Sequence, residues 1–196
     1  MYKLFKDVPA QHTEVTGKTL FPMKFCQIRW TQNVAVSKRA LEVFDDKCKF
    51  VKTAKLPQII SVASIKEASS DPLAKVKIAC FVSVAQSLEG FLTTFQSPSP
   101  LAPFMYDDLM ELVKSLMLRC IKTEIIERLN TASELMKVDL ETNLVSIKKV
   151  VVAVSVQSFL SISMASDLQI MSFQTSCRTF LVAAIEKVLE RSPLKY

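Results

Sequence analysis

The segment DPLAKVKIACFVSVAQSLEGFLTTF, residues 71–95, decides the fold more than any other part of the chain. Asp71 followed by Pro72 is typical of a helix start, with an acidic N-cap and a proline in the first turn. Apolar and small residues then recur every three or four positions, which is the period of one helical face. They are Leu73, Val76, Ala79, Cys80, Ser83, Val84, Ser87, Leu88, Phe91, Leu92 and Phe95. The pattern predicts a long core helix, and Gly90 within it is expected to mark a close contact with another helix.

The helical period extends to most of the remaining chain. Helices are predicted over residues 33–52, 58–70, 104–130 and 166–191, with a break at the three prolines between residues 97 and 103. The inward side chains expected in the last helix are Phe173, Cys177, Phe180, Leu181, Ala184, Ile185, Val188 and Leu189. Two glycines in 196 residues leave little material for tight hairpins or phosphate-binding loops. The sequence therefore predicts an all-α fold, a helical bundle.

Two segments near the middle of the chain are less regular. Residues 131–149 mix short helical pieces with polar turns. Residues 150–156 are rich in β-branched side chains and fit either a strand or a buried helix. The uncharged run 150–166 contains Gln157 and several serines, and it is shorter than the roughly 20 apolar residues that a membrane span needs. We expect this run to be buried core.

The N-terminal part differs in character from the bundle. Residues 1–20 are mixed and polar and are expected to form an irregular lead-in. Residues 21–28 alternate apolar with polar or basic side chains, which predicts a short extended arm. Residues 21–196 are expected to form a single helical domain.

Positive charge is concentrated at the N-terminal end. The net charge of the chain is +6, and residues 1–60 carry eleven Lys or Arg against five Asp or Glu. Residues 61–196 carry fourteen of each, so the whole excess lies in the first segment. Such asymmetry indicates a surface that faces an anionic partner, nucleic acid being the commonest, although a solvated lysine-rich surface has the same composition.

The sequence offers no pattern for catalysis, a metal site or a cofactor. Five widely spaced cysteines and a single histidine, His12, do not match a zinc site or a disulfide framework, so we expect reduced thiols in an intracellular protein. The adjacent acids Asp45-Asp46 and Asp107-Asp108 point about 100° apart on a helix, and the second pair favours a helix N-terminus. No small-molecule substrate and no membrane partner are expected.

Arg29 and Trp30 are the most distinctive candidate contacts. An indole beside basic residues can stack on an unpaired base while arginine contacts phosphate. The alternative is that Trp30 anchors the arm to the bundle and Arg29 caps a helix end. The sequence does not decide between these two roles.

Three blocks of sequence resemble the central region of hAT-superfamily transposases and the genes and fragments derived from them. The first joins residues 25–30 (Phe-Cys-Gln-Ile-Arg-Trp) to Asn33 and to residues 39–44 (Arg-Ala-Leu-Glu-Val-Phe). The second is residues 101–109 and the third is residues 189–196. Together they span most of residues 18–196.

The resemblance implies a helical domain that is inserted in an RNase H-like catalytic core. In that family the tryptophan of the Arg-Trp pair is thought to handle the DNA end, and this role carries over to Arg29 and Trp30 only. The segments that hold the catalytic carboxylates have no recognisable counterpart here. The chain therefore looks like a non-catalytic fragment of a transposase, and it is expected in the nucleus if it still binds DNA.

Three hypotheses about function follow. The first is DNA binding, with Arg29 and Trp30 near the bases and Lys24, Lys38 and Arg39 on phosphates. The second is an interaction module that meets a protein partner or forms a homo-oligomer, and an exposed apolar patch would favour it. The third is a transposon remnant without a selected function.

Overall fold

The described part of the chain is all-α, as the sequence predicts. The structure is a computed structural model that describes residues 13–14, 17, 19–21, 23–24, 32–54, 56, 60–96 and 102–195. Its helices are α2 (Gln32–Thr53), α3 (Ile60–Ser70), α4 (Ala74–Phe95), α5 (Met105–Met117), α6 (Thr123–Ile126), α7 (Ala132–Met136), α8 (Val154–Ser161) and α9 (Asp167–Arg191). Three short 3-10 turns accompany them, namely η2 (Ala102–Phe104), η3 (Ile147–Lys149) and η4 (Pro193–Lys195). The extended arm expected over 21–28 lies mostly outside the described residues.

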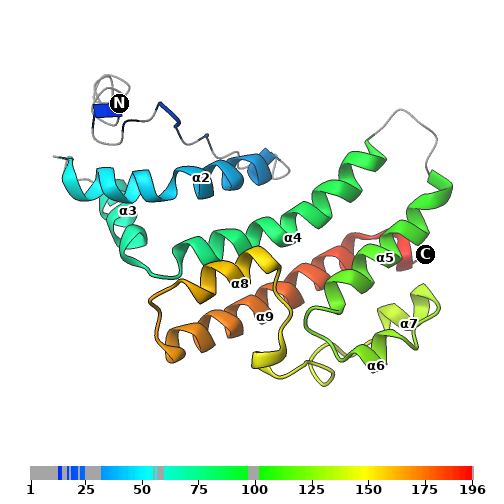
Figure 1. Cartoon of the computed structure of the whole chain (residues 1–196). Helices are drawn as coiled ribbons and strands as arrows, with labels where there is room; N and C mark the ends of the chain where they lie inside the picture. The colour runs from blue at the N-terminus through cyan, green and yellow to red at the C-terminus, as the bar shows by residue number, and fades with distance from the viewer. Residues whose placement is uncertain are drawn as a thin grey trace.

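The core lies where α4, α5 and α9 meet (Figure 1). On α9 the buried side chains recur every four residues, so that they form one ridge along the helix. They are Phe173, Cys177, Leu181, Ile185 and Leu189. The start of α9 is fixed by a capping box, in which the side chains of Ser166 and Gln169 each accept a hydrogen bond from the backbone N–H of the other. These local signals explain why the predicted helix 166–191 agrees with the observed one.

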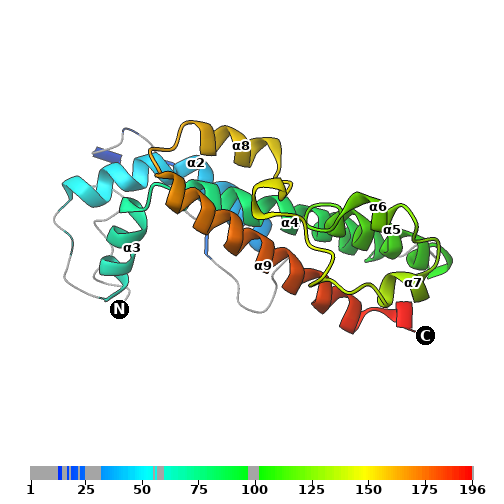
Figure 2. The same cartoon turned by 90° about the horizontal axis from the view of Figure 1, so that it is seen from below.

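Two further helices cover α4. Helix α2 packs along α4 on one side, and α8 packs on it from another (Figure 1). Viewed from below, α9 runs beneath α4 and continues past α5 toward the C-terminus (Figure 2). Helix α3 is attached through α2 and, within its described side chains, buries Val62. The first half of α4 is therefore surrounded, and it forms the centre of the domain.

The predicted helix over residues 104–130 is wrong in its second half. Helix α5 ends at Met117, and Ile121 then forms an isolated antiparallel bridge with Leu144. The carbonyl groups of Arg119 and Cys120 accept hydrogen bonds from the N–H groups of Val151 and Val145, at 2.8 and 2.9 Å. These long-range partners replace the helical ones, although Cys120 and Ile121 are buried as expected. Burial follows the apolar pattern here, whereas helix continuity does not.

The expectation of a buried run over 150–166 is also wrong for much of its length. Residues 151–153 are irregular and α8 follows from Val154. Val150 and Val156 are buried, but Val154 is 79% exposed and Met164 is 95% exposed. Val154 is exposed because α8 packs on α4 with one face and no described element covers its other face, and Met164 lies in the irregular segment between α8 and α9.

Gly90 does not mark a helix contact. A Cβ atom built at this position would meet no atom within 4 Å, apart from the local backbone of the helix. The glycine is exposed in the second half of α4, so the predicted close approach is wrong.

Among the described helices, α4 alone has the length and apolar composition of a membrane span. A core helix meets the same criterion, and α4 contacts α2, α5, α8 and α9 in the structure.

Candidate nucleic-acid interface and apolar groove

The predicted DNA contacts fall on two different parts of the chain. Arg29 and Trp30 lie outside the described residues, so their roles stay predictions. Lys24 is exposed ahead of α2, and Lys38 is exposed on the first turns of α2. Arg39 is partly buried beside Lys38. The structure thus places three of the five predicted residues at or before the N-terminal end of α2.

One face of α2 carries most of its exposed charges. Lys38, Glu42, Asp45, Lys49 and Lys52 are all exposed and follow one another at intervals of three or four residues. This spacing puts them in one stripe about 20 Å long, since each helical residue adds about 1.5 Å. The stripe contains both acidic and basic side chains, so its attraction for an anionic partner depends on whether the two acids are paired with other cations.

Both acids of the stripe have basic partners outside it. The Nε atom of Arg39 donates to the Glu42 carboxylate at 2.8 Å. The Lys75 ammonium, on α4, lies 2.5 Å from the Asp45 carboxylate and is also positioned over the rings of Phe44 and Phe159. Within the described part of the chain, Lys38, Lys49 and Lys52 have no ion pair. The stripe therefore presents three lysines to solvent with its acids neutralised by neighbours.

Lys47 has a different role from the other lysines of α2. Its ammonium lies 4.9 Å from the ring centroid of Phe21 and 6.0 Å from that of Phe50. Burial lowers the pKa of Lys47, and the nearby Asp46 carboxylate opposes that shift. Lys47 thus connects a residue of the N-terminal segment to α2 by cation–π contacts, and it is not part of the exposed stripe.

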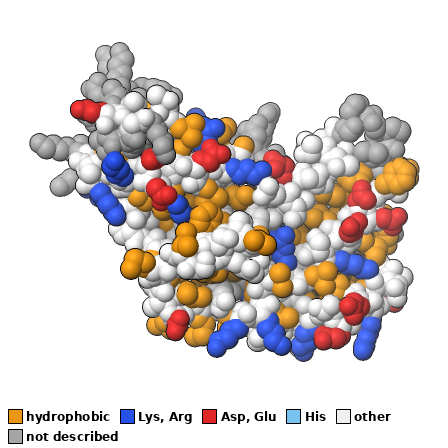
Figure 3. All heavy atoms as spheres, in the orientation of Figure 1, with side chains coloured by type: hydrophobic (Ala, Val, Ile, Leu, Met, Phe, Trp, Pro, Cys, Tyr) orange, Lys and Arg blue, Asp and Glu red, His pale blue; other side chains and the backbone are white. Residues whose placement is uncertain are grey.

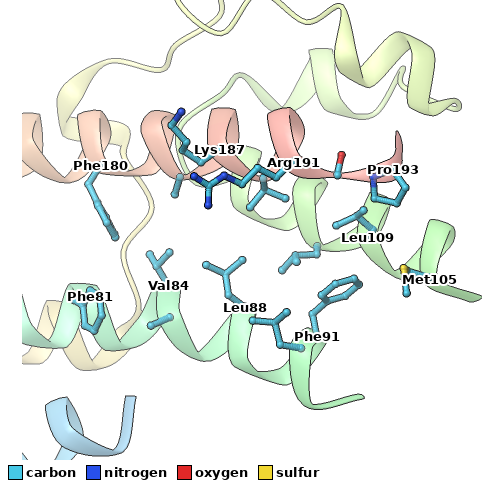
Figure 4. Close-up of a pocket in the computed structure, with 16 residues that line it drawn as sticks. Phe81, Val84, Leu88, Phe91, Met105, Leu109, Phe180, Lys187, Arg191 and Pro193 are labelled. Carbon is cyan, nitrogen blue, oxygen red and sulfur yellow. The ribbon is translucent and has the colours of Figure 1, made fainter. Parts of the chain in front are cut away.

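An apolar groove lies between α4, α5 and α9. It has a volume of about 510 Å³, within the range of small-molecule sites. Its walls are formed mainly by apolar side chains, including Leu88 and Phe91 of α4, Met105 and Leu109 of α5, and Val188 of α9 (Figure 4).

Two cations lie on the α9 side of this groove. The Lys187 ammonium forms an ion pair with Glu190 and points away from the cavity (Figure 4). The Arg191 guanidinium extends over the groove, and it has no hydrogen bond or ion pair among the described residues. One feature of the sequence indicates this arrangement. Lys187 and Arg191 are four residues apart at the edge of the apolar face of α9, and residues with that spacing lie next to each other on a helix.

The groove can bind apolar surface, but its lining supplies no acid–base pair. Its polar lining consists of Lys187, Arg191 and Ser192, and the Ser192 hydroxyl donates to the Leu189 carbonyl at 3.1 Å. Across the described residues, no three Asp, Glu, Cys or His side chains are grouped so that they could hold a metal ion.

Comparisons with known proteins add nothing to this geometry. No protein-family model, no curated protein and no solved structure matches the chain.

Proposed function

We propose that this chain is a non-catalytic helical module, derived from an hAT transposase, that binds DNA through its basic segment 18–55. The observation that carries the proposal is the charge distribution: residues 1–60 hold the entire net charge of +6. The resemblance of three sequence blocks to hAT transposases supports a nucleic-acid partner over other polyanions.

The exposed stripe of α2 supports the same proposal. Its free lysines, Lys38, Lys49 and Lys52, span a length that can follow a DNA backbone. Arg39 would exchange its Glu42 partner for a phosphate, and Lys24 would extend the contact toward Arg29 and Trp30. In this proposal the lysines supply affinity and Trp30 supplies stacking on an unpaired base.

Salt dependence of binding is the sharpest test. Each phosphate contact contributes a slope of about −0.9 to the plot of log affinity against log salt, so the three lysines together contribute about −3. A variant with Lys38, Lys49 and Lys52 changed to Gln should lose that part of the slope in fluorescence anisotropy with a labelled duplex. The matched control changes Lys122, Lys148 and Lys149 to Gln, because these exposed lysines lie in the part of the chain that has no net charge.

Two results would contradict the proposal. One is the absence of binding at low salt, and the other is an equal loss of slope in the two variants. Trp30 emission gives an independent readout, because quenching that is stronger with a DNA hairpin than with a duplex would place the indole against unpaired bases.

A second candidate function is self-association through the corner between α8 and α9. Val154, Ile162, Met164 and Leu168 are all at least 73% exposed there. Figure 3 shows hydrophobic side chains at the surface over α8 and the start of α9. Residues 150–166 carry no charge, and Asp167 is the one exposed charge within residues 150–168, so little charge repulsion opposes the meeting of two copies at this corner.

Sedimentation velocity over a range of concentrations tests this second function. The wild-type chain should show a concentration-dependent rise in sedimentation coefficient, and the variant Ile162→Glu/Met164→Glu should remain monomeric. Ile65→Glu, at an exposed position of α3, should behave like the wild type. A wild-type chain that is monomeric at every concentration would rule out self-association at this corner.

A further inference from the structure

Two cysteines from distant parts of the sequence meet in the core. The Sγ atoms of Cys80 on α4 and Cys177 on α9 are 3.0 Å apart, and 97 residues separate them along the chain. Both side chains are buried. A disulfide bond has an S–S length of about 2.05 Å, so an approach of about 1 Å would complete it.

The pair is buried but lies at the wall of a crevice. This crevice, of about 250 Å³, is lined by both cysteines together with Lys77, Phe81, Phe173 and Phe180. The crevice and the larger groove share Phe81 and Phe180, whose ring centroids are 6.5 Å apart. The crevice therefore offers a small oxidant a path toward the pair from the surface.

The surroundings favour ionisation of one thiol of the pair. The hydrogen bond from Cys177 lowers the pKa of Cys80; burial opposes this shift, and the positive charge of Arg119 reinforces it. The Arg119 guanidinium is held toward α4 by hydrogen bonds to the hydroxyls of Ser83 and Ser87, at 3.4 and 3.3 Å. A thiolate is the nucleophilic form of cysteine, so we assign the attacking role to Cys80 and the resolving role to Cys177.

The other described cysteines provide a contrast. Burial raises the pKa of the Cys120 thiol to about 11, with a smaller opposing effect of Arg178. Burial likewise raises the pKa of Cys48, whose thiol donates to the Ser69 carbonyl. Neither has another thiol within hydrogen-bond distance among the described residues, so they lack the geometry for an intramolecular disulfide.

We propose that Cys80 and Cys177 form a redox site that hydroperoxides oxidise to a disulfide, which ties α4 to α9. The Cys80 thiolate attacks the peroxide oxygen and breaks the O–O bond, giving a sulfenic acid and, after proton uptake, water or an alcohol. The Cys177 sulfur then attacks the sulfenic sulfur, and the displaced hydroxide takes up the Cys177 proton to leave as water. In total two thiols lose two electrons and one peroxide is reduced.

The first test uses the reduced wild-type chain and hydrogen peroxide. After brief oxidation and blocking of free thiols, mass spectrometry of a non-reduced digest should find the Cys80 and Cys177 peptides joined, with the loss of two hydrogens. The thermal midpoint should rise by about 10 °C or more, because the bond closes a loop of nearly 100 residues, and dithiothreitol should reverse the rise. Joined peptides involving Cys48 or Cys120 in equal yield, or no joined peptide, would overturn the proposal.

Single variants separate the two chemical steps. In Cys177→Ser the sulfenic acid should persist at Cys80, where dimedone traps it, whereas Cys80→Ser should react much more slowly at Cys177. Cys120→Ser is the matched control, since it removes a buried thiol of the same core and should leave disulfide formation unchanged. If a variant fails to fold by circular dichroism, the wild-type peptide map still decides the outcome.

Discussion

One apolar stripe runs through both halves of α4, but the two halves have different surroundings in the structure. Residues 74–85 contribute seven buried side chains, packed among α2, α8 and α9. Residues 86–95 contribute none, and Leu88, Phe91 and Leu92 line the groove instead. An apolar stripe in the sequence shows which face of a helix can be buried. How much of that face is buried depends on which helices pack against it.

The largest expected effect tests the buried core against the groove side. Leu181, on the buried face of α9 one turn after Cys177, is 1% exposed. Leu181→Ala should destabilise the chain by about 2–5 kcal/mol, since it removes buried surface and leaves a cavity. Leu88→Ala, on the groove side, should cost less than half as much, measured by urea unfolding with equal m-values. Equal losses in the two variants would mean that the groove side is packed as tightly as the buried core.

A smaller effect is expected at the start of α4. The Asp71 carboxylate accepts a hydrogen bond from the Leu73 N–H at 2.8 Å and pairs with Lys77 at 2.6 Å. The N-cap residue of α4 is Leu73, not Asp71 as the sequence predicts, but Asp71→Ala still removes a hydrogen bond and should cost about 1 kcal/mol. Asp71→Asn can keep the hydrogen bond from the Leu73 N–H and removes the charge, so it should cost less than the alanine variant.

The same residue gives a pH dependence of known sign. Partial burial acts to raise the pKa of Asp71, but the hydrogen bonds from Lys77 and Leu73 outweigh it and lower that pKa. A folded-state pKa below the unfolded value, about 3.9, means that the contribution of Asp71 is complete above that pH. The stability difference between the wild type and Asp71→Asn should shrink as pH falls below about 4. A difference that is constant down to pH 2 would contradict this assignment.

The smallest expected effect is a gain in stability, and it tests the second half of α4, residues 86–95. Gly90 is exposed in α4, and an added Cβ would meet no atom within 4 Å. Gly90→Ala should stabilise the chain by about 0.5–1 kcal/mol, because alanine loses less conformational freedom in a helix. A decrease in the thermal midpoint would mean that another segment closes on the second half of α4.

Local signals made much of the fold predictable. The helix over 166–191 was predicted because its cap and its apolar spacing lie within the same segment. The end of α5 could not be predicted, since the carbonyls of Arg119 and Cys120 accept hydrogen bonds from residues 25 or more positions away. Phe180 was expected inward, but it is 40% exposed beside the groove. The groove forms where the helices are not tightly packed, and the spacing of apolar residues in the sequence does not show where that occurs.

The candidate sites were predictable to a smaller extent. The sequence identifies the basic segment by charge counting, and exposure of Lys38 agrees with it. The sequence does not show that Glu42 pairs with Arg39 or that Asp45 pairs with Lys75. Both pairs depend on which side chains face each other, and the second also depends on the packing of α4 against α2. The groove and the Cys80–Cys177 pair depend on the approach of α4 and α9, which are separated by about half of the chain.

This separation has a consequence for synthesis on the ribosome. Helix α4 is complete at Phe95, but the ridge of α9 that packs on it ends at Leu189. At about 5–20 residues per second, the gap corresponds to roughly 5–20 s of translation. During that interval α4, the most apolar long helix among those described, has α2 beside it but lacks α9. We therefore expect the nascent chain to depend on chaperones more than the stability of the finished core would suggest.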